Sequence, residues 1–147
     1  MVEFKQHIDI HKTVDEVWPL FGDVSRWAQW FGAIDAATGV DAVVQGEAFE
    51  WSKAGKTGSG SIAHVDNVDS NRDLKLVFLG GDYPIHHDFT LHRGGFLGLN
   101  EGVTRLEYHL YYDPPGFIGD FVRGGNPIEA VQVKQTLEKI KQLAEHK

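Results

Sequence analysis

The sequence predicts an α+β fold in which one strand and two short helices precede six further strands and a long C-terminal helix. Residues 2–11 alternate between apolar and polar side chains, whereas residues 14–31 carry apolar residues at helical spacing. From about residue 33 to 113 the chain returns to short alternating runs, which are separated by turn residues. Alternation with a period of two is typical of half-buried strands. Because the connections between the runs are too short for crossover helices, the seven strands are expected to form one antiparallel sheet.

The composition is that of one ordinary globular domain. The chain has 147 residues, so a single domain is expected over residues 1–147. Hydrophobic residues make up 41% of the chain and charged residues 24%, which favours neither disorder nor membrane insertion. No apolar run approaches the roughly 20 residues that a membrane-spanning helix needs. The formal net charge of −7 gives no electrostatic reason to expect nucleic acid or an anionic membrane as a partner.

The N-terminus and the absence of cysteine bear on the compartment. The first residues carry charges at positions 3, 5 and 9 and lack the apolar centre of a signal peptide, which predicts a cytoplasmic location. The chain contains no cysteine, so disulfides, thiolate catalysis and cysteine-ligated zinc are excluded. A chain without cysteine also fits a reducing compartment.

Two short helices are predicted after the first strand. Thr13 and Glu16 have the spacing of a capping box that starts the first helix. Pro19 removes a backbone hydrogen bond, so this helix is expected to be brief or kinked. Asp23 is suited to cap the second helix. The apolar faces of the two helices consist of Val14, Val17, Trp18, Phe21, Val24, Trp27, Trp30 and Phe31.

Six strands are predicted next. Their ranges are 36–44, 46–53, 58–69, 73–80, 84–93 and 102–113. The first of them is the weakest, because its Ala-Ala-Thr-Gly-Val-Asp-Ala segment has little apolar surface to pack. The glycine-rich segments 58–61 and 94–98 match neither a P-loop nor a dinucleotide-binding fingerprint, and both are interpreted as hairpin tips.

The last predicted element is a helix over residues 127–145. Asn126 suits the N-cap, Pro127 the first helical position and Glu129 the position three residues past the cap. The apolar stripe of this helix consists of Ala130, Val133, Leu137, Ile140 and Ala144. A helix with one such stripe is expected to lie across the sheet. Apolar residues in the segment 117–122 predict one loose helical turn before it.

The segment that follows the first strand also carries a family resemblance. Residues 17–23 read V-W-x-L-x-x-D, and Trp27 and Trp30 come after them. This pattern resembles the opening of START-like (SRPBCC) domains, the superfamily that includes Bet v 1-type allergens and polyketide cyclase/dehydrase-type proteins. The resemblance implies a helix-grip fold, in which a seven-stranded antiparallel sheet is wrapped round the long C-terminal helix and grips a hydrophobic cavity.

Alternation along the strands indicates which polar side chains face the helix. The inward polar groups expected from it are Gln6, His87, Tyr108 and Tyr112. His87 is a candidate general base, because burial disfavours its charged form, or else a core histidine bonded to a tyrosine hydroxyl or a water. Tyr108 and Tyr112 either hydrogen-bond a ligand carbonyl or hydroxyl, or fill space with the hydroxyl at the rim. These three side chains are the candidate catalytic residues.

The implied cavity and the inward faces together predict a set of ligand-binding residues. The set consists of Trp27, Trp30, Phe31, Phe49, Trp51, His87, Phe89, Tyr108, Tyr112, Phe121 and Val133. Phe49 and Trp51 alternate with polar neighbours, so they line the cavity or fill it. For Trp27, Trp30 and Phe31 the alternative is a purely structural role, because an aromatic stripe at helical spacing usually packs in the core.

Eight histidines raise the question of a metal site. His86, Asp88 and His92 share one strand face, and Glu107 and His109 belong to the next strand. That face is expected to be exposed to solvent, and it lacks a closed ligand set such as His-Glu-x-x-His on a helix. No metal and no cofactor are therefore expected, and cross-strand pairs account for the charged face.

Three functions follow from the residues and the resemblance. The first is binding of a small hydrophobic ligand, either a lipid, a polyketide-like molecule or an aromatic one, in the cavity. The second is a cyclase/dehydratase-type enzyme in which His87 removes a proton and Tyr108 or Tyr112 polarises a carbonyl. The third is a protein-interaction module, because residues 27–32 are similar to the tryptophan-rich segment of Hsp90-activator-type START-like domains.

The expected partner is a small hydrophobic molecule, and the expected assembly is a monomer or a weak homodimer. Strand 36–44 would offer an unpaired backbone for dimer pairing if it lay at a sheet edge, although its poor apolar alternation weakens such an interface. The sequence leaves open whether any reaction is catalysed.

Overall fold

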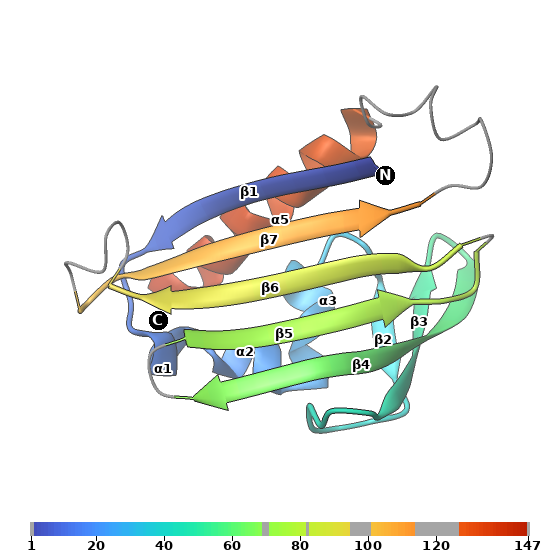
Figure 1. Cartoon of the computed structure of the whole chain (residues 1–147), viewed down its shortest axis with the longest axis horizontal. Helices are drawn as coiled ribbons and strands as arrows, with labels where there is room; N and C mark the ends of the chain where they lie inside the picture. Colours follow the sequence, from blue (N-terminus) through green and yellow to red (C-terminus); the bar gives the residue numbers. More distant parts are fainter. Residues whose placement is uncertain (1, 69–70, 82, 95–100, 114–126, 147) are drawn as a thin grey trace.

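The computed structural model describes residues 2–68, 71–81, 83–94, 101–113 and 127–146. Its strands are β1 (Val2–Ile10), β2 (Ala36–Thr38), β3 (Ala48–Lys53), β4 (Lys56–Val68), β5 (Asn71–Phe78), β6 (Ile85–Arg93) and β7 (Thr104–Tyr112). They form one antiparallel sheet in the order β1-β7-β6-β5-β4-β3-β2. The long helix α5 (Pro127–Glu145) and the short helices lie on the same face of this sheet (Figure 1). The predicted α+β helix-grip architecture is confirmed.

Register places the inward residues of the central strands opposite one another. His87 of β6 pairs with Leu110 of β7, and Phe89 pairs with Tyr108. All four of these side chains are buried, while their neighbours in each strand are partly exposed. Because side chains alternate across a pleated strand, one face of β6 and β7 is directed toward the helices. The orientation predicted from alternation is confirmed for these two strands.

Gln6 lies on the predicted face of the sheet, opposite Tyr108, but it is not buried. It is exposed and lines a groove between β1 and α5, whereas Val2 and Ile10 at the two ends of β1 are fully buried. The reason is that β1 is an edge strand, so its inward face opens to solvent between its two anchored ends. The predicted orientation of Gln6 toward the helix is therefore confirmed, although the side chain lies at the open edge of the sheet and not in the core.

The two predicted short helices are present as four consecutive segments. These are α1 (Val14–Val17), α2 (Pro19–Gly22), the 3-10 helix η1 (Val24–Arg26) and α3 (Trp27–Trp30). The capping box is confirmed, because the Glu16 amide donates to the Thr13 hydroxyl at 3.2 Å and the Thr13 amide donates to the Glu16 carboxylate at 3.1 Å. Pro19 occupies the first position of α2, where its missing N–H costs nothing. Asp23 accepts a hydrogen bond from the Ser25 amide at 3.1 Å and caps η1.

Aromatic side chains from these segments and from strands β3 and β6 fill the space between α3 and the sheet. Phe21, Trp27, Trp30, Phe31, Phe49 and Phe89, which we call the aromatic cluster, are each at most 2% exposed. The two indoles donate to backbone carbonyls, Trp27 to Phe21 at 2.9 Å and Trp30 to Leu20 at 2.8 Å. Buried polar groups need such partners. These bonds fix α3 to the end of α2.

The glycine-rich segment 58–61 lies inside β4 and not at a hairpin tip. The tip is formed by Ala54 and Gly55, which have φ values of 51° and 82°. Trp51 pairs with Gly58, and Phe49 pairs with Gly60. A Cβ atom at Gly58 would lie 2.5 Å from the Trp51 ring, and one at Gly60 would overlap the Phe49 ring. The two glycines therefore leave room for the rings of the neighbouring strand.

Other boundaries differ from the predictions by a few residues. The strand predicted over 36–44 shortens to the three residues of β2, as its poor apolar pattern would favour, and it does lie at a sheet edge. In α5 the apolar stripe is buried from Val133 to Ala144, but Ala130 is exposed. Asn126, segments 95–98 and 117–122, and with them Phe121, lie outside the described residues. Within the described part, the structure contains no helix that is both long and apolar enough to cross a membrane.

Candidate functional site

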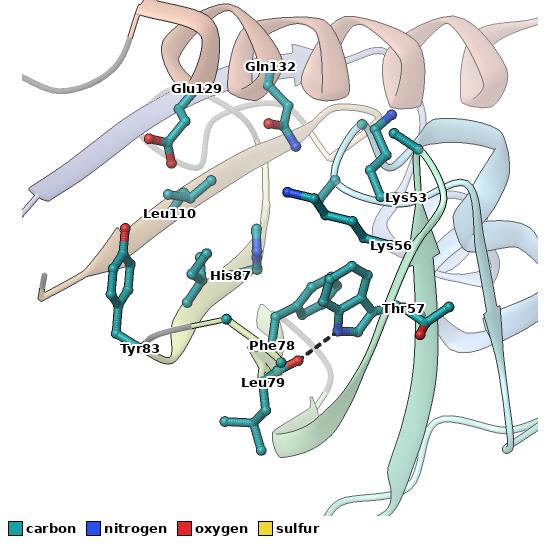
Figure 2. Close-up of a pocket in the computed structure, with 17 residues that line it drawn as sticks. Lys53, Lys56, Thr57, Phe78, Leu79, Tyr83, His87, Leu110, Glu129 and Gln132 are labelled. Atoms are coloured by element: carbon teal, nitrogen blue, oxygen red, sulfur yellow. Dashed lines mark hydrogen bonds between the residues drawn. The ribbon is translucent and has the colours of Figure 1, made fainter.

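A cavity of about 710 Å³ opens beside the first turns of α5, between the β3–β4 hairpin and the connection from β5 to β6 (Figure 2). Its larger apolar side chains are Trp51, Phe78, Leu79, Tyr83, Ile85 and Leu110. Its polar side chains are Lys53, Lys56, Thr57, His87, Glu129 and Gln132. Small-molecule sites in proteins are clefts of about 300–1,000 Å³ with a mostly apolar lining and a few polar groups. The cavity fits this description.

The Trp51 ring forms one wall of the cavity and is held in place by backbone groups. Its indole N–H lies 2.9 Å from the carbonyl oxygen of Ser59 and 3.1 Å from that of Leu79, the second of which is the dashed line in Figure 2. The ring also stacks on Phe78 with 5.7 Å between centroids. Gly58 lies directly under the ring. The cavity wall is thus a preformed feature of the β3, β4 and β5 strands.

His87 reaches the cavity from the central strand β6 and is 2% exposed. Its Nδ1 atom lies 2.6 Å from the hydroxyl oxygen of Tyr108 on β7. Burial, and to a lesser extent the charge of His86, lowers the pKa of His87 to about 3. Burial also raises the pKa of Tyr108 well above its usual range, and the carboxylate of Glu129 adds to this effect. Both groups are therefore neutral at physiological pH and share a hydrogen bond.

This geometry combines the two interpretations of His87 that the sequence leaves open. The ring is a core histidine satisfied by a tyrosine hydroxyl, and it also lines the cavity. An imidazole with a pKa of about 3 is a weak base, because general bases work best when their pKa lies near the operating pH. As a neutral hydrogen-bonding group, by contrast, His87 is well suited to meet a ligand oxygen.

Glu129 joins the start of α5 to the sheet. Its carboxylate accepts a hydrogen bond of 2.6 Å from the hydroxyl of Tyr112, and Tyr112 stacks on Tyr83 with 5.1 Å between ring centroids. Burial, together with the bond to Glu129, raises the pKa of Tyr112. Glu129 lines the cavity although the sequence indicated only a capping role for it. Tyr112 itself is not a lining residue, but it packs against Tyr83, which is one.

The β3–β4 hairpin supplies the opposite wall. Lys53 lies 3.4 Å from the carboxylate of Asp35, which also accepts a hydrogen bond of 2.8 Å from the Ala54 amide. The Ala54 amide is the main reason why the pKa of Asp35 is lowered, and Lys53 adds to the shift. This network holds the hairpin against the segment that follows α3. Sequence patterns did not indicate it, because Asp35 lies outside the predicted strands and is distant in sequence from Lys53.

The structure separates the predicted ligand-binding residues into two groups. Trp51 and His87 line the cavity. Trp27, Trp30, Phe31, Phe49, Phe89, Tyr108, Tyr112 and Val133 are buried at 6% exposure or less and are not among its lining residues. The two groups meet at His87, whose Nδ1 atom lies 2.6 Å from the Tyr108 hydroxyl and whose ring centroid lies 5.1 Å from that of Phe31. Ligand contact by the buried group stays a prediction, as it does for Phe121.

On the opposite face of the sheet, the histidines considered as metal ligands have cross-strand partners. His86 stacks on Tyr111 with 4.5 Å between ring centroids, and His92 lies 3.5 Å from Glu107. His109 lies 2.8 Å from Glu3. In the described part of the chain, the side chains that approach a three-ligand arrangement are others, namely His64, Asp66 and Asp73, whose ligand atoms lie within 4.8 Å of one another.

Comparisons with known structures support the fold. A hypothetical protein of Helicobacter pylori is 11% identical with a TM-score of 0.73, and the match covers 97% of this chain and 86% of that chain. A STAR-related lipid transfer protein of Xanthomonas axonopodis is 12% identical with a TM-score of 0.68, covering 97% and 85%. A protein of Mesorhizobium loti is 16% identical with a TM-score of 0.68, covering 98% and 97%.

Sequence comparison identifies the family. No curated protein matches the chain. The family model described as polyketide cyclase / dehydrase and lipid transport, however, matches residues 1–145, which is nearly the whole length. The match agrees with the helix-grip fold and with the V-W-x-L-x-x-D segment of the sequence. The chain therefore belongs to the polyketide cyclase / dehydrase and lipid transport family, within the Bet v 1-like (SRPBCC) superfamily.

Proposed function

We propose that the cavity binds a small hydrophobic molecule of the lipid, polyketide-like or aromatic class. The observation that carries this proposal is the preformed cavity of about 710 Å³ with its mostly apolar lining. Family membership supports a hydrophobic ligand-binding domain, and one structural neighbour is named as a lipid transfer protein. Burial of apolar ligand surface against Trp51, Phe78 and Leu110 would stabilise the complex by about 25 cal/mol per Å².

His87 gives this pocket a polar point at which a ligand is oriented. When the Tyr108 hydroxyl donates to Nδ1, the Nε2 atom carries the proton and is a donor for a ligand carbonyl or hydroxyl. In the other tautomer Nε2 is an acceptor. A ligand hydroxyl is the matching partner in either case, because it both donates and accepts, whereas a ligand carbonyl matches only the first tautomer. A neutral partner is expected because His87 carries no charge near neutral pH.

The two alternative functions receive less support. An enzyme of the cyclase or dehydratase type would need His87 to act as the general base. The lowered pKa of His87 makes it a weak base. An interaction module would need the tryptophans of segment 27–32 at the surface, but Trp27 is fully buried and Trp30 is 2% exposed. Binding without turnover is the function that the geometry favours.

A cavity-filling variant tests the proposal. Ile85 is half-buried and lines the cavity, so Ile85→Trp is expected to occupy part of the space and to weaken binding of 1-dodecanol by at least about tenfold. The matched control is Val44→Trp, at a position that is 50% exposed and does not line the cavity. Binding is followed by tryptophan fluorescence, because Trp51 is a cavity residue. Circular dichroism checks that both variants are folded.

Equal affinity of Ile85→Trp and the wild type for 1-dodecanol would contradict this site. Native mass spectrometry of the purified protein provides an independent readout. A hydrophobic molecule released on denaturation from the wild type, and depleted in Ile85→Trp, is the expected result.

A further inference from the structure

We propose that the ligand of this cavity is an amphipathic anion, whose acidic head group is bound at the cavity mouth by Lys56 and Gln132. The inference rests on the proposed function and adds the chemical class of the ligand. Carboxylate is the head group considered first, and any compact anion with oxygen acceptors has the same chemistry.

Lys56 and Gln132 face the cavity from opposite walls. Lys56 is the first residue of β4, directly after the hairpin turn, and Gln132 lies in the second turn of α5. In Figure 2 the Lys56 side chain extends across the cavity, and the amide of Gln132 points toward the same space from the helix. Neither side chain forms a hydrogen bond or an ion pair with any residue that the structure describes. Both are therefore available to a ligand.

The other two charged groups of the cavity already have a hydrogen-bond or ion-pair partner. Lys53 lies 3.4 Å from Asp35, and the carboxylate of Glu129 accepts the hydroxyl of Tyr112 at 2.6 Å. The Glu129 carboxylate has a hydrogen-bond partner, the neutral hydroxyl of Tyr112. Of the two lysines that line the cavity, Lys56 is thus the one without a counter-ion in the described part of the chain. This contrasts with the chain as a whole, whose formal net charge is −7.

Strand register provides a second reason to expect an anion here. Lys53 and Lys56 are a directly opposed pair at the end of the β3–β4 ladder. Like charges directly opposite each other in a sheet are destabilising. Asp35 relieves this repulsion on the side of Lys53. An anionic head group at Lys56 would relieve it on the other side.

The donor set suits a carboxylate. A lysine ammonium group offers three N–H donors and the glutamine amide offers two, and hydrogen bonds between charged groups are stronger than neutral ones. The apolar part of the ligand would then lie along Trp51, Phe78 and Leu110. A molecule with one apolar body and one acidic end matches both regions at once.

Dodecanoate and 1-dodecanol separate the two contributions, because they share the alkyl chain and differ in the head group. Lys56→Gln is expected to weaken dodecanoate binding about fivefold at low salt and to leave 1-dodecanol binding within about twofold, since Lys56 is exposed and its attraction is partly screened. Lys56→Glu is expected to weaken dodecanoate binding further. The matched control is Lys139→Gln, at an exposed position of α5 that does not line the cavity, and it should change neither affinity.

The salt dependence is a second readout. Raising the salt concentration should weaken dodecanoate binding to the wild type and leave 1-dodecanol binding unchanged, because salt screens only the charged contact. An unchanged melting temperature of Lys56→Gln would show that the effect is not a loss of fold.

The outcomes distinguish the two proposals. If the wild type binds 1-dodecanol but Lys56→Gln and Lys139→Gln bind dodecanoate equally well, the anionic head group is overturned while the hydrophobic cavity stands. If Lys56→Gln weakens both ligands to the same extent, the specific role of charge is likewise overturned. If the wild type binds neither molecule, the proposed function itself fails and this inference fails with it.

Discussion

The space between the sheet and the helices has two regions that differ in how they are occupied. The aromatic cluster around Trp27 and Trp30 fills one region completely, whereas the region beside the first turns of α5 keeps a cavity of about 710 Å³. Phe89 and His87 show how close the two regions are, because they are inward neighbours on β6. Phe89 packs against Trp30, and His87 lines the cavity.

The difference teaches that aromatic content does not by itself mark a ligand site. The cluster contains two of the four tryptophans, yet their rings pack against phenylalanine rings of the cluster and their N–H groups donate to backbone carbonyls. The cavity holds one tryptophan, Trp51, and remains open because Gly58 lets that ring lie flat against β4. The open region also carries the polar side chains.

The largest effect that would test this comparison is the loss of a cluster ring. Trp27→Ala is expected to lower the free energy of unfolding by about 4 kcal/mol, because it creates a core cavity and removes the bond to the Phe21 carbonyl. Trp51→Ala is expected to cost about half as much, since Trp51 is only partly buried. Urea unfolding of both variants measures the difference. Equal losses would mean that the two regions do not differ in packing.

A smaller effect is expected from adding one methyl group to β4. Gly60→Ala would push against Phe49 and should cost about 1–3 kcal/mol of stability, because overpacking strains a filled core. Gly58→Ala would displace Trp51 instead, so it should also change the affinity for 1-dodecanol. Gly81→Ala is the control for stability alone, since the nearest neighbour of its Cβ atom would be 4.0 Å away but Gly81 itself lines the cavity. An affinity that responds to Gly60→Ala and not to Gly58→Ala would reverse the assignment of the two regions.

The smallest of the three effects concerns the pH dependence at the boundary between the regions. The pKa of His87 is about 3 in the folded protein and ordinarily 6.5, so the unfolded chain takes up a proton that the folded protein does not. Stability from this source is fully present above about pH 6.5 and is lost as the pH falls toward 3. Between pH 7 and pH 5 the loss is about 2 kcal/mol.

The variant His87→Gln is expected to lack this component of the pH dependence, while its amide oxygen can still accept from Tyr108. Chemical unfolding of both proteins at pH 7 and pH 5 gives the comparison, and other titrating groups cancel because they are common to both. If the free energy of unfolding fell by the same amount between pH 7 and pH 5 in both proteins, His87 would not be held in its neutral form by the fold.

The sequence by itself determined the type and order of the elements. Alternation in β6 and β7 indicated which of their side chains face the helices, the Thr13–Glu16 pair marked the first helix, and short connections required an antiparallel sheet. These features depend on neighbours within a few residues, so periodicity and capping rules reach them.

The tertiary structure alone decided where the cavity lies and which side chains surround it. Lys56 and Gln132 come from elements far apart in the chain, and Glu129 gained its place through a bond to Tyr112. The sequence pattern placed Gly58 in a hairpin tip, but in the structure it lies within β4 and pairs with Trp51. The physical reason is that an empty volume is what remains after all side chains have packed. No local pattern encodes that remainder, because it depends on how every ring in the aromatic cluster fits against the next.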